Sequence, residues 1–317
     1  MDIVLLFPGQ GSQKPGMGRD LAEAFPAARD AFSAVDEALA TPLSRLCFDG
    51  PADDLTLTHN AQPALLAHGA AAWAVAREAL TPHVRAAAGH SLGEFTAYHA
   101  ADALTLPGAA RLVRRRGELM YEAGTARPGA MAAILGDTTT PIETLCEQAS
   151  REAGLVVPAN YNSTGQVVLS GEVSGVERAM ALAKAAGAKR AMRLNVSGAF
   201  HSPLMEPAAG GLREALASAA LSDARVPVYA NVTAAPVTAA GTAETLLLRQ
   251  LTSPVDWTGV VRALARDYPG ALFVEMGPGT VLAGLVKKIA PDAQTVPCGT
   301  AADVESLLQR VSECAST

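Results

Sequence analysis

The sequence predicts an α/β protein with a parallel sheet and an inserted smaller subdomain, and three observations point to this fold class. A short apolar run ends at Gly89, passes through the pattern Gly-x-Ser-x-Gly and leads at once into a helix-like segment, which is the strand–turn–helix unit of many α/β sheets. Residues 3–7 form a second apolar run, followed by a glycine-rich loop. Residues 129–196 then alternate between short strand and helix patterns, which indicates a separate subdomain.

The composition describes a globular protein and excludes several function classes. The 317 residues are 49% hydrophobic and 18% charged, with a net charge of −6. Because nucleic-acid-binding surfaces are basic, and because the longest basic run is 114–116, we expect no nucleic acid as a partner. No apolar stretch reaches the ~18 residues of a membrane helix, and residues 1–7 lack the basic start of a signal peptide, so we expect no membrane partner.

The 4 cysteines are scattered along the chain without the spacing of a metal site or a redox pair. Reduced, buried thiols are the simpler interpretation, and they are typical of the cytoplasm. We therefore expect a cytoplasmic monomer that uses no metal and no cofactor.

The segments on either side of the subdomain read as strands and helices of one larger domain. Alanine-rich helices are expected at 19–40 and 60–80, and another helix at 107–122. The later expected elements are strands at 226–231 and 271–276, and helices at 243–251, 255–267, from about 280 to 289, and 302–313.

The inserted segment has the order strand, helix, strand, strand, helix, strand, which is the ferredoxin-like plan. Its expected strands are 131–135, 155–159, 166–170 and 190–196, and its helices are 141–151 and 174–186. We assign residues 128–197 to this small subdomain. Residues 1–127 and 198–317 form the larger catalytic core.

Ser91 is the candidate nucleophile, at the centre of the Gly-x-Ser-x-Gly pattern. A turn this sharp holds the serine in strained dihedrals, and only glycine leaves room two residues before and two residues after it. The helix that follows offers unpaired N–H groups and the positive end of its dipole. These features suit a serine that attacks a carbonyl group and must stabilise the resulting oxyanion.

The loop at 8–13 is rich in glycine but fails the templates of phosphate-binding loops. A dinucleotide fingerprint would need glycine where Lys14 stands, and a P-loop would need lysine where Met17 stands. What remains is a loop at the carboxyl end of a strand, where ligands bind in open α/β sheets. A backbone N–H in this loop, for instance that of Gln10, could face an oxyanion.

A serine nucleophile needs a base, and His201 is the candidate among the 6 histidines. His99 lies two turns along the helix that follows the serine, and the side chain of His90 should point away from the turn. Neither Asp102 nor Asp137 lies at a convincing strand end to complete a triad. The sequence therefore favours a Ser–His dyad, with a backbone carbonyl that holds the imidazole.

Arg116 is the candidate for binding an anion. On a helical wheel of residues 107–122 it falls in the middle of the apolar arc, while the other charged residues occupy the opposite face. A guanidinium on an apolar face is costly unless it meets an anion. Two interpretations remain open: a structural ion pair inside the protein, or a site that grips the carboxylate of a ligand.

Several motifs, in order along the chain, resemble those of one enzyme family. They are residues 7–13 (FPGQGSQ), 62–64 (QPA), 89–94 (GHSLGE), 116–117 (RG), 200–202 (FHS), 231–232 (NV), 250–257 (QLTSPVDW) and 275–279 (EMGPG). The set is similar to that of the malonyl-CoA:acyl-carrier-protein transacylase family. The resemblance implies an α/β-hydrolase-like core with a ferredoxin-like insertion. It also implies ping-pong transfer of malonyl groups for fatty-acid biosynthesis.

The resemblance implies roles for individual residues. Ser91 would be the nucleophile, His201 the base, and Arg116 the partner of the malonyl carboxylate. The backbone N–H groups of Gln10 and Leu92 would form the oxyanion hole.

Further implied positions surround the substrate. The main-chain carbonyl of Gln250 would orient the base. Phe200 would lie against the α-carbon of the acyl group; in related acyltransferase domains phenylalanine here goes with malonyl and serine with methylmalonyl. The residues that match other pocket positions are Gln62, His90, Asn162 and Asn231.

The implied substrates are malonyl-CoA, a coenzyme A thioester, and the phosphopantetheine thiol of an acyl carrier protein. Carrier proteins are typically acidic, so a chain with a net charge of −6 needs a local basic patch to bind one. The candidate docking residues are Lys287 and Lys288 in the core, and Lys189 and Arg190 in the subdomain.

Three alternatives stay open. The same dyad could serve a thioesterase or esterase that transfers the acyl group to water. The chain could be a carrier-protein-binding module without catalysis. It could also be a discrete acyltransferase that loads a polyketide synthase.

Overall fold

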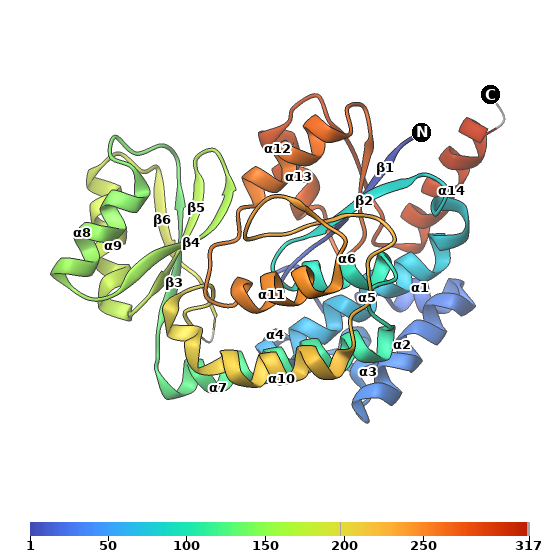
Figure 1. The fold of residues 1–317 in the computed structure, drawn as a ribbon, viewed down its shortest axis with the longest axis horizontal. Helices are drawn as coiled ribbons and strands as arrows, with labels where there is room; N and C mark the ends of the chain where they lie inside the picture. Colours follow the sequence, from blue (N-terminus) through green and yellow to red (C-terminus); the bar gives the residue numbers. More distant parts are fainter. Residues whose placement is uncertain (197, 316–317) are drawn as a thin grey trace.

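The computed structural model describes residues 1–196 and 198–315. Two sheets lie side by side: a six-stranded sheet on the side of both termini, and a four-stranded sheet at the opposite end of the molecule (Figure 1). In the described part of the chain, no helix is long and apolar enough to cross a membrane.

The six-stranded sheet has the order β10-β9-β1-β2-β7-β8. Its strands are β1 (Ile3–Phe7), β2 (Val84–Gly89), β7 (Val228–Tyr229), β8 (Pro236–Val237), β9 (Leu272–Glu275) and β10 (Gln294–Pro297). All neighbours are parallel except β7 and β8. Phe7 pairs with Gly89 and Leu6 with Glu275, so β1, β2 and β9 end at the same edge, and the loops that follow them meet there.

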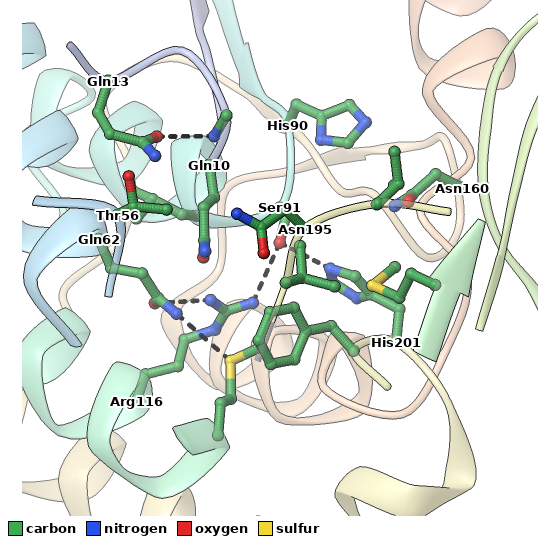
Figure 2. Close-up of a pocket in the computed structure, with 17 residues that line it drawn as sticks. Gln10, Gln13, Thr56, Gln62, His90, Ser91, Arg116, Asn160, Asn195 and His201 are labelled. Carbon is green, nitrogen blue, oxygen red and sulfur yellow. Dashed lines mark hydrogen bonds between the residues drawn. The ribbon is translucent and has the colours of Figure 1, made fainter. Parts of the chain in front are cut away.

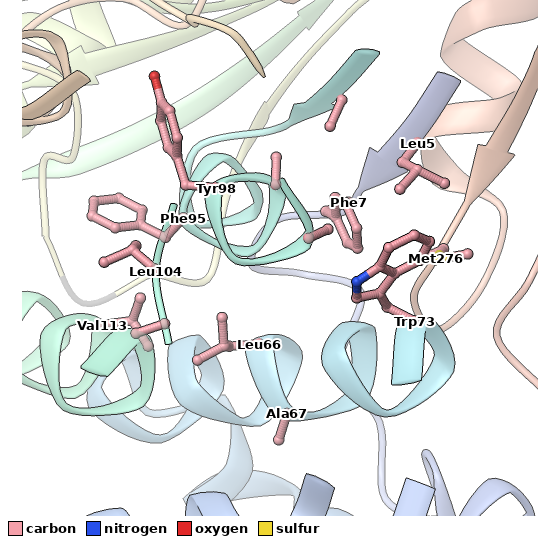
Figure 3. Packing of buried hydrophobic residues seen from close by; sticks show 14 of the residues in the cluster. Leu5, Phe7, Leu66, Ala67, Trp73, Phe95, Tyr98, Leu104, Val113 and Met276 are labelled. Carbon is pink, nitrogen blue, oxygen red and sulfur yellow. The ribbon is translucent and has the colours of Figure 1, made fainter. Parts of the chain in front are cut away.

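Side chains of β1 alternate between two hydrophobic layers, as the period of a strand requires. Leu5 and Phe7 face α5 (Thr58–Leu80), α6 (Leu92–Ala100) and α7 (Leu106–Ala126), where they pack with Leu66 and Phe95 (Figure 3). Val4, with Leu6, packs in the other layer against α12 (Trp257–Asp267) and α13 (Val281–Ile289). The main sheet is therefore covered by helices on both faces.

The other helices surround this core. They are α1 (Arg19–Ala24), α2 (Pro26–Leu39), α3 (Leu43–Asp49), α4 (Ala52–Thr56), the 3-10 helix η1 (Pro203–Ala208), α10 (Ala209–Ala219), α11 (Ala240–Gln250) and α14 (Ala301–Ala315).

The four-stranded sheet confirms the element order expected for residues 129–196. Its elements are β3 (Ala130–Leu135), α8 (Ile142–Glu152), β4 (Val156–Ser163), β5 (Gln166–Gly171), α9 (Val173–Ala185) and β6 (Arg190–Arg193). The strands are antiparallel in the order β4-β5-β3-β6, and α8 and α9 cover the outer face (Figure 1). On the other face, Met131 and Val168 join the hydrophobic cluster of the main domain. The small sheet is thus packed directly against the rest of the chain.

Some sequence expectations were wrong. The single helix at 19–40 is two helices, because Phe25 adopts an extended conformation and Pro26 starts a new helix. The helix expected at 60–80 already begins at Thr58 and carries Pro63 in its interior. The helices α3, α4, η1 and α10 and the two edge strands β8 and β10 of the main sheet were not expected from the sequence. The expected subdomain boundary at residue 197 lies outside the described residues.

Candidate active site

Ser91 occupies a strained turn between β2 and α6. Its backbone has φ 52° and ψ −107°, a left-handed φ that a serine rarely adopts. A Cβ on Gly89 would lie 1.9 Å from the carbonyl carbon of Gly93, and a Cβ on Gly93 would lie 2.0 Å from the backbone oxygen of Phe7. Both glycines are required by this close approach, which places the serine at the carboxyl edge of the sheet.

Asn231, in the turn that follows the neighbouring strand β7, fixes the turn of Ser91. The backbone N–H of Ser91 donates to Asn231 Oδ1 at 2.7 Å, and Asn231 Nδ2 donates to the backbone oxygen of Gly89 at 2.7 Å. One side chain therefore binds the backbone on both sides of residue 90. These bonds hold the strained conformation in place, because leaving either buried group unpaired is costly.

His201 lies beside the serine. Its Nε2 is 2.7 Å from Ser91 Oγ, and its Nδ1 is 2.8 Å from the main-chain oxygen of Gln250. A carbonyl oxygen only accepts, so Nδ1 carries the hydrogen and Nε2 is left to accept the serine proton. Burial, together with the charge of Arg116, lowers the pKa of His201 to about 3. The imidazole is therefore neutral at physiological pH, as a general base must be.

The two aspartates considered for a triad lie elsewhere. Asp102 pairs with Arg77 and Arg225, and Asp137 lines a different cavity with Gly136. Within the described residues, the partner of His201 Nδ1 is a main-chain carbonyl rather than a carboxylate.

Arg116 confirms the expectation that it lies on the buried face of its helix: it is only 1% exposed. Nη1 donates to Gln62 Oε1 at 2.7 Å, and Nη2 donates to Gln250 Oε1 at 2.9 Å and to Ser91 Oγ at 3.2 Å. The guanidinium carbon lies 5.2 Å from the ring centroid of Phe95. Burial lowers the pKa of Arg116 to about 10, so the side chain is still protonated at neutral pH.

The direct partners of this cation are neutral. None of the ion pairs among the described residues includes Arg116. Its Nε is buried without a hydrogen-bond partner. The geometry thus favours a guanidinium that receives the carboxylate of a ligand over a structural salt bridge.

A cavity of about 350 Å³ opens between the two sheets in front of Ser91 (Figure 2). Gln62, Arg116 and His201 give it a polar end. Its apolar lining comes from Met120, Met131, Leu194, Val196 and Phe200. The cavity therefore offers a charged end and an apolar wall within reach of one nucleophile.

The two amides expected to form an oxyanion hole both belong to residues that line the cavity, Gln10 and Leu92. Gln10 follows β1, and Leu92 is the first residue of α6. In the hydrogen-bond network of the described residues, neither backbone N–H has an acceptor. Unpaired amides that share a cavity with a nucleophile, one of them at the start of a helix, can stabilise negative charge on an oxygen.

His90 and Asn162 lie together at one side of the cavity. His90 lines it, and its Nε2 is 2.8 Å from Asn162 Oδ1. The His90 ring also packs against Trp257, with 5.6 Å between the centroids. Asn162 itself is not among the lining residues; Asn160, two positions earlier on β4, lines the cavity instead. Asn162 therefore contacts a residue that lines the cavity without lining it itself.

The four basic residues considered for docking lie outside the cavity. Lys189 and Arg190 at the start of β6, and Lys287 and Lys288 at the end of α13, are all exposed. Lys288 Nζ donates to Gln166 at 3.3 Å. The strand register pairs Leu135 with both Gln166 and Arg190, so the two basic pairs lie at the same end of the small sheet.

Sequence reasoning assigned no role to several residues at this site, among them Asn160 and Glu94. Asn160 lines the cavity, and nothing in the pattern of β4 distinguishes it. Glu94 is fully buried beneath the serine and bonds to Gln250. A signal for Glu94 did exist, because it is the only carboxylate in the helix Leu92–Ala100, as Arg116 is the only charge on its apolar arc.

A strained serine, a neutral histidine within hydrogen-bond distance and two unpaired amides define the class of serine-dependent acyl-transfer enzymes. The comparisons with known proteins narrow this class. The model of the acyl transferase domain family matches residues 4–306. The malonyl CoA-acyl carrier protein transacylase of Bacillus subtilis strain 168 is 46% identical over 312 residues, which cover 98% of each chain.

Solved structures agree with this result. An acyl-carrier-protein S-malonyltransferase from Bartonella henselae is 41% identical, with a TM-score of 0.93 over 98% of this chain and 100% of that one. A malonyl-transacylase in complex with its type II PKS acyl-carrier protein is 39% identical, with a TM-score of 0.92 over the same shares. The chain belongs to the malonyl-CoA:acyl-carrier-protein transacylase family.

Proposed function

We propose that this enzyme transfers the malonyl group of malonyl-CoA to the phosphopantetheine thiol of an acyl carrier protein, for fatty-acid biosynthesis. One observation carries the proposal beyond family membership: Arg116 Nη2 lies 3.2 Å from Ser91 Oγ. In a malonyl group, a single methylene separates the reacting carbonyl from the carboxylate. A cation that binds this carboxylate must therefore lie next to the nucleophile, and Arg116 does.

In the first half-reaction, Ser91 Oγ attacks the thioester carbonyl carbon while His201 Nε2 takes the serine proton. The amides of Gln10 and Leu92 stabilise the oxyanion. The C–S bond then breaks, and coenzyme A leaves as a thiol with the proton returned from His201. A malonyl ester of Ser91 remains, with its carboxylate on Arg116.

In the second half-reaction, the carrier thiol gives its proton to His201 and attacks the ester carbonyl. The C–O bond breaks, and Ser91 regains the proton from His201. Transfer to a thiol must outcompete hydrolysis, and the apolar wall of Met120, Met131 and Phe200 disfavours water beside the ester. No metal or cofactor is needed for either step.

Phe200 supports a preference for malonyl over branched acyl groups. It is 6% exposed and lines the cavity directly beside the base in sequence. A methyl branch on the α-carbon would have to share space with this ring. Gln62 Oε1 accepts a hydrogen bond from Arg116 and so orients the guanidinium, which supports a role for Gln62 in binding the malonyl carboxylate.

The wider assignment follows from the same observations. The helix-covered parallel sheet with its strained serine supports an α/β-hydrolase-like core at 1–127 and 198–317, and the strand order β4-β5-β3-β6 supports a ferredoxin-like subdomain at 128–197. Cys47, Cys146 and Cys298 are buried free thiols, which supports a reducing, cytoplasmic environment. Among the described residues, only five large apolar side chains are exposed (Met1, Leu57, Tyr121, Met192 and Val281), which supports a monomer.

A second candidate is the loading of a polyketide carrier, because the relative solved with a type II PKS acyl-carrier protein is nearly as similar as the Bartonella henselae structure.

The decisive experiment is incubation with labelled malonyl-CoA, followed by mass spectrometry of the Ser91 peptide and transfer to a panel of carrier proteins. A Ser91 adduct that moves to fatty-acid carrier protein is the expected result. Release of label as free malonate would instead identify a thioesterase, and no adduct would contradict catalysis.

A further inference from the structure

Glu94 is a fully buried carboxylate that the mechanism above does not use. It lies on α6, three residues after the nucleophile, and is 0% exposed. Its Oε2 accepts hydrogen bonds from Gln250 Nε2 at 2.6 Å and from the backbone N–H of Asn231 at 3.2 Å. Burial raises its pKa to about 7. A carboxylate is retained in such a position only if its bonds stabilise something nearby, because burial alone is costly.

The side chain of Gln250 lies between two ionisable groups. Its Oε1 accepts from Arg116 Nη2 at 2.9 Å, while its Nε2 donates to Glu94 and to the backbone oxygen of Ser91 at 3.1 Å. An amide has an accepting and a donating end, and a half-turn would set NH₂ against the guanidinium. The acceptor at Glu94 favours the orientation that presents oxygen to Arg116.

The same residue also holds the base. The main-chain oxygen of Gln250 accepts from His201 Nδ1 at 2.8 Å, so a change in the position of residue 250 reaches the imidazole directly. Asn231, the second residue bound to Glu94, fixes the turn of Ser91. The guanidinium of Arg116, the imidazole of His201 and the turn of Ser91 are therefore all connected, through Gln250 or Asn231, to the same carboxyl oxygen of Glu94.

We infer that Glu94 is a positioning residue for acyl transfer: it sets the orientation of the Gln250 amide, and through it the guanidinium of Arg116 and the imidazole of His201. This inference rests on the proposed function. It assigns to Glu94 no contact with the substrate. Its effect should be larger for an acyl group that uses Arg116 than for one that does not.

The chain offers a matched control in Glu275. This carboxylate is also 0% exposed, and it accepts from the backbone N–H groups of Leu282 at 2.9 Å and Ala283 at 2.8 Å, at the start of α13. Glu275→Met removes a buried carboxylate of equal size without touching Gln250. It therefore measures the general cost of such a loss to folding.

The experiment compares wild type, Glu94→Met, Glu94→Gln and Glu275→Met by single-turnover acylation with malonyl-CoA and with acetyl-CoA, alongside thermal unfolding. Glu94→Met should slow malonylation by about 10- to 100-fold and lower the malonyl-to-acetyl rate ratio by about 5-fold or more. Glu94→Gln should restore most of the rate, because its amide oxygen can accept the same two hydrogen bonds. Glu275→Met should lower the melting temperature and leave the ratio unchanged.

Three outcomes would each overturn the inference. The malonyl-to-acetyl rate ratio could stay unchanged in Glu94→Met, or it could fall equally in Glu275→Met. The third such outcome is a Glu94→Gln variant that acylates no faster than Glu94→Met. If Glu94→Met does not fold, Glu94→Asp is measured in its place. Aspartate keeps the charge, but its shorter side chain moves the acceptor away from Gln250, so the malonyl-to-acetyl rate ratio must fall as well. The wild-type measurement separates the two proposals. Wild type without any malonyl adduct contradicts the proposed function itself, whereas an active wild type with indifferent Glu94 variants contradicts only the role of Glu94.

Discussion

The cavity has two walls, one from the carboxyl edge of the six-stranded sheet and the other from the four-stranded sheet. The first wall carries the reacting groups, joined by short hydrogen bonds: Ser91 to His201 at 2.7 Å, and His201 to Gln250 at 2.8 Å. The second wall contributes Met131 and Asn160, which bond to neither the nucleophile nor the base. The reacting groups thus lie outside the four-stranded sheet, since Ser91 follows β2, His201 precedes η1 and Gln250 ends α11, and the four-stranded sheet shapes the space in front of them.

The two walls are nevertheless tied together. Tyr161 donates its backbone N–H to the oxygen of Val255 at 2.9 Å, and Val255 donates to the oxygen of Ala159 at 2.9 Å. His90 reaches Asn162 across the same junction. We therefore expect substitutions of the Ser91–His201 dyad to change the rate of every acyl transfer, whereas substitutions of other cavity residues or of the rim should change which acyl group or partner is accepted.

The largest effects are expected at the dyad. Ser91→Ala should abolish the malonyl adduct, and His201→Ala should slow acylation by about 10³-fold, because the proton acceptor is lost. Mass spectrometry of the adduct and single-turnover rates measure both. His99→Ala is the matched control. His99 lies on α6 outside the cavity, and its Nδ1 also contacts a main-chain oxygen, that of Leu104 at 3.0 Å. A His201→Ala rate near that of His99→Ala would contradict the assignment of the base.

Arg116→Ala should come next, with a loss of about 3–5 kcal/mol in malonyl binding, because a desolvated carboxylate would be left without a partner. Acetyl-CoA has no carboxylate and should lose far less. The test is kcat/KM for both substrates. Arg114→Ala on the same helix, which removes a half-buried guanidinium that donates to Asn60 at 2.7 Å, should affect neither substrate selectively. Equal losses for malonyl and acetyl would make Arg116 a structural residue.

The positions of Ser91 and Arg116 in the site could be predicted from the sequence. The Gly-x-Ser-x-Gly pattern places Ser91 because the sharp turn demands those residues, and the helical wheel places Arg116 because one charge interrupts an apolar face. The strand and helix order of the small sheet was predictable for a similar reason, since each element carries a regular pattern. By contrast, helices α3 and α4 are too short to show a period, and Pro26 divides a pattern that otherwise looks continuous.

Other parts of the site leave little trace in the sequence. The carbonyl that holds His201 is a backbone group, which any residue at position 250 carries, so only the family resemblance suggested it. Asn160 reaches the cavity because β4 shifts register between Pro158 and Asn160, and such an irregularity cannot be read from alternation of residue types. Contacts between distant segments, rather than local patterns, decide these positions.

At the cavity wall, Phe200→Ser should narrow the preference for malonyl over methylmalonyl. A methyl branch against the wild-type ring costs about 1–3 kcal/mol by overpacking, and removing the ring removes that cost. The ratio of kcat/KM for the two thioesters is the measurement, and the rate of malonylation should fall only modestly. An unchanged ratio would place the determinant of acyl specificity elsewhere around the cavity.

At the rim, charge reversal of a docking pair should raise KM for the carrier protein by about 2- to 10-fold and leave KM for malonyl-CoA unchanged, because an acidic partner loses an attractive contact. The pairs are Lys287 with Lys288, and Lys189 with Arg190, which lie at the same end of the small sheet. Reversal of Lys184, exposed on α9, serves as the control. A pair whose reversal changes neither KM does not belong to the docking surface.

The smallest change is expected in the pH dependence of acylation. Burial lowers the pKa of His201 to about 3, so the base should stay neutral, and the rate constant should vary less than about twofold between pH ~8 and ~6. Stability should behave differently. Because the folded pKa lies below the unfolded value of about 6.5, the unfolded chain binds more protons, and stability from His201 is lost as the pH falls below ~6.5. Glu94 affects stability in the opposite direction. Because burial raises its pKa to about 7 in the folded protein, its contribution to the free energy of unfolding is lost as the pH rises from ~4.5 through that value.

Stopped-flow acylation and thermal unfolding across the same pH series separate these contributions, and Glu94→Gln removes the Glu94 titration from both. With that variant, the melting temperature should fall on acidification while the rate per folded enzyme stays level. A rate that halves near pH ~6.5 would show that His201 titrates as an ordinary exposed histidine. In that case burial beside the charge of Arg116 would not hold the imidazole in its neutral form, and His201 would be more accessible to water than its hydrogen bonds to Ser91 and Gln250 imply.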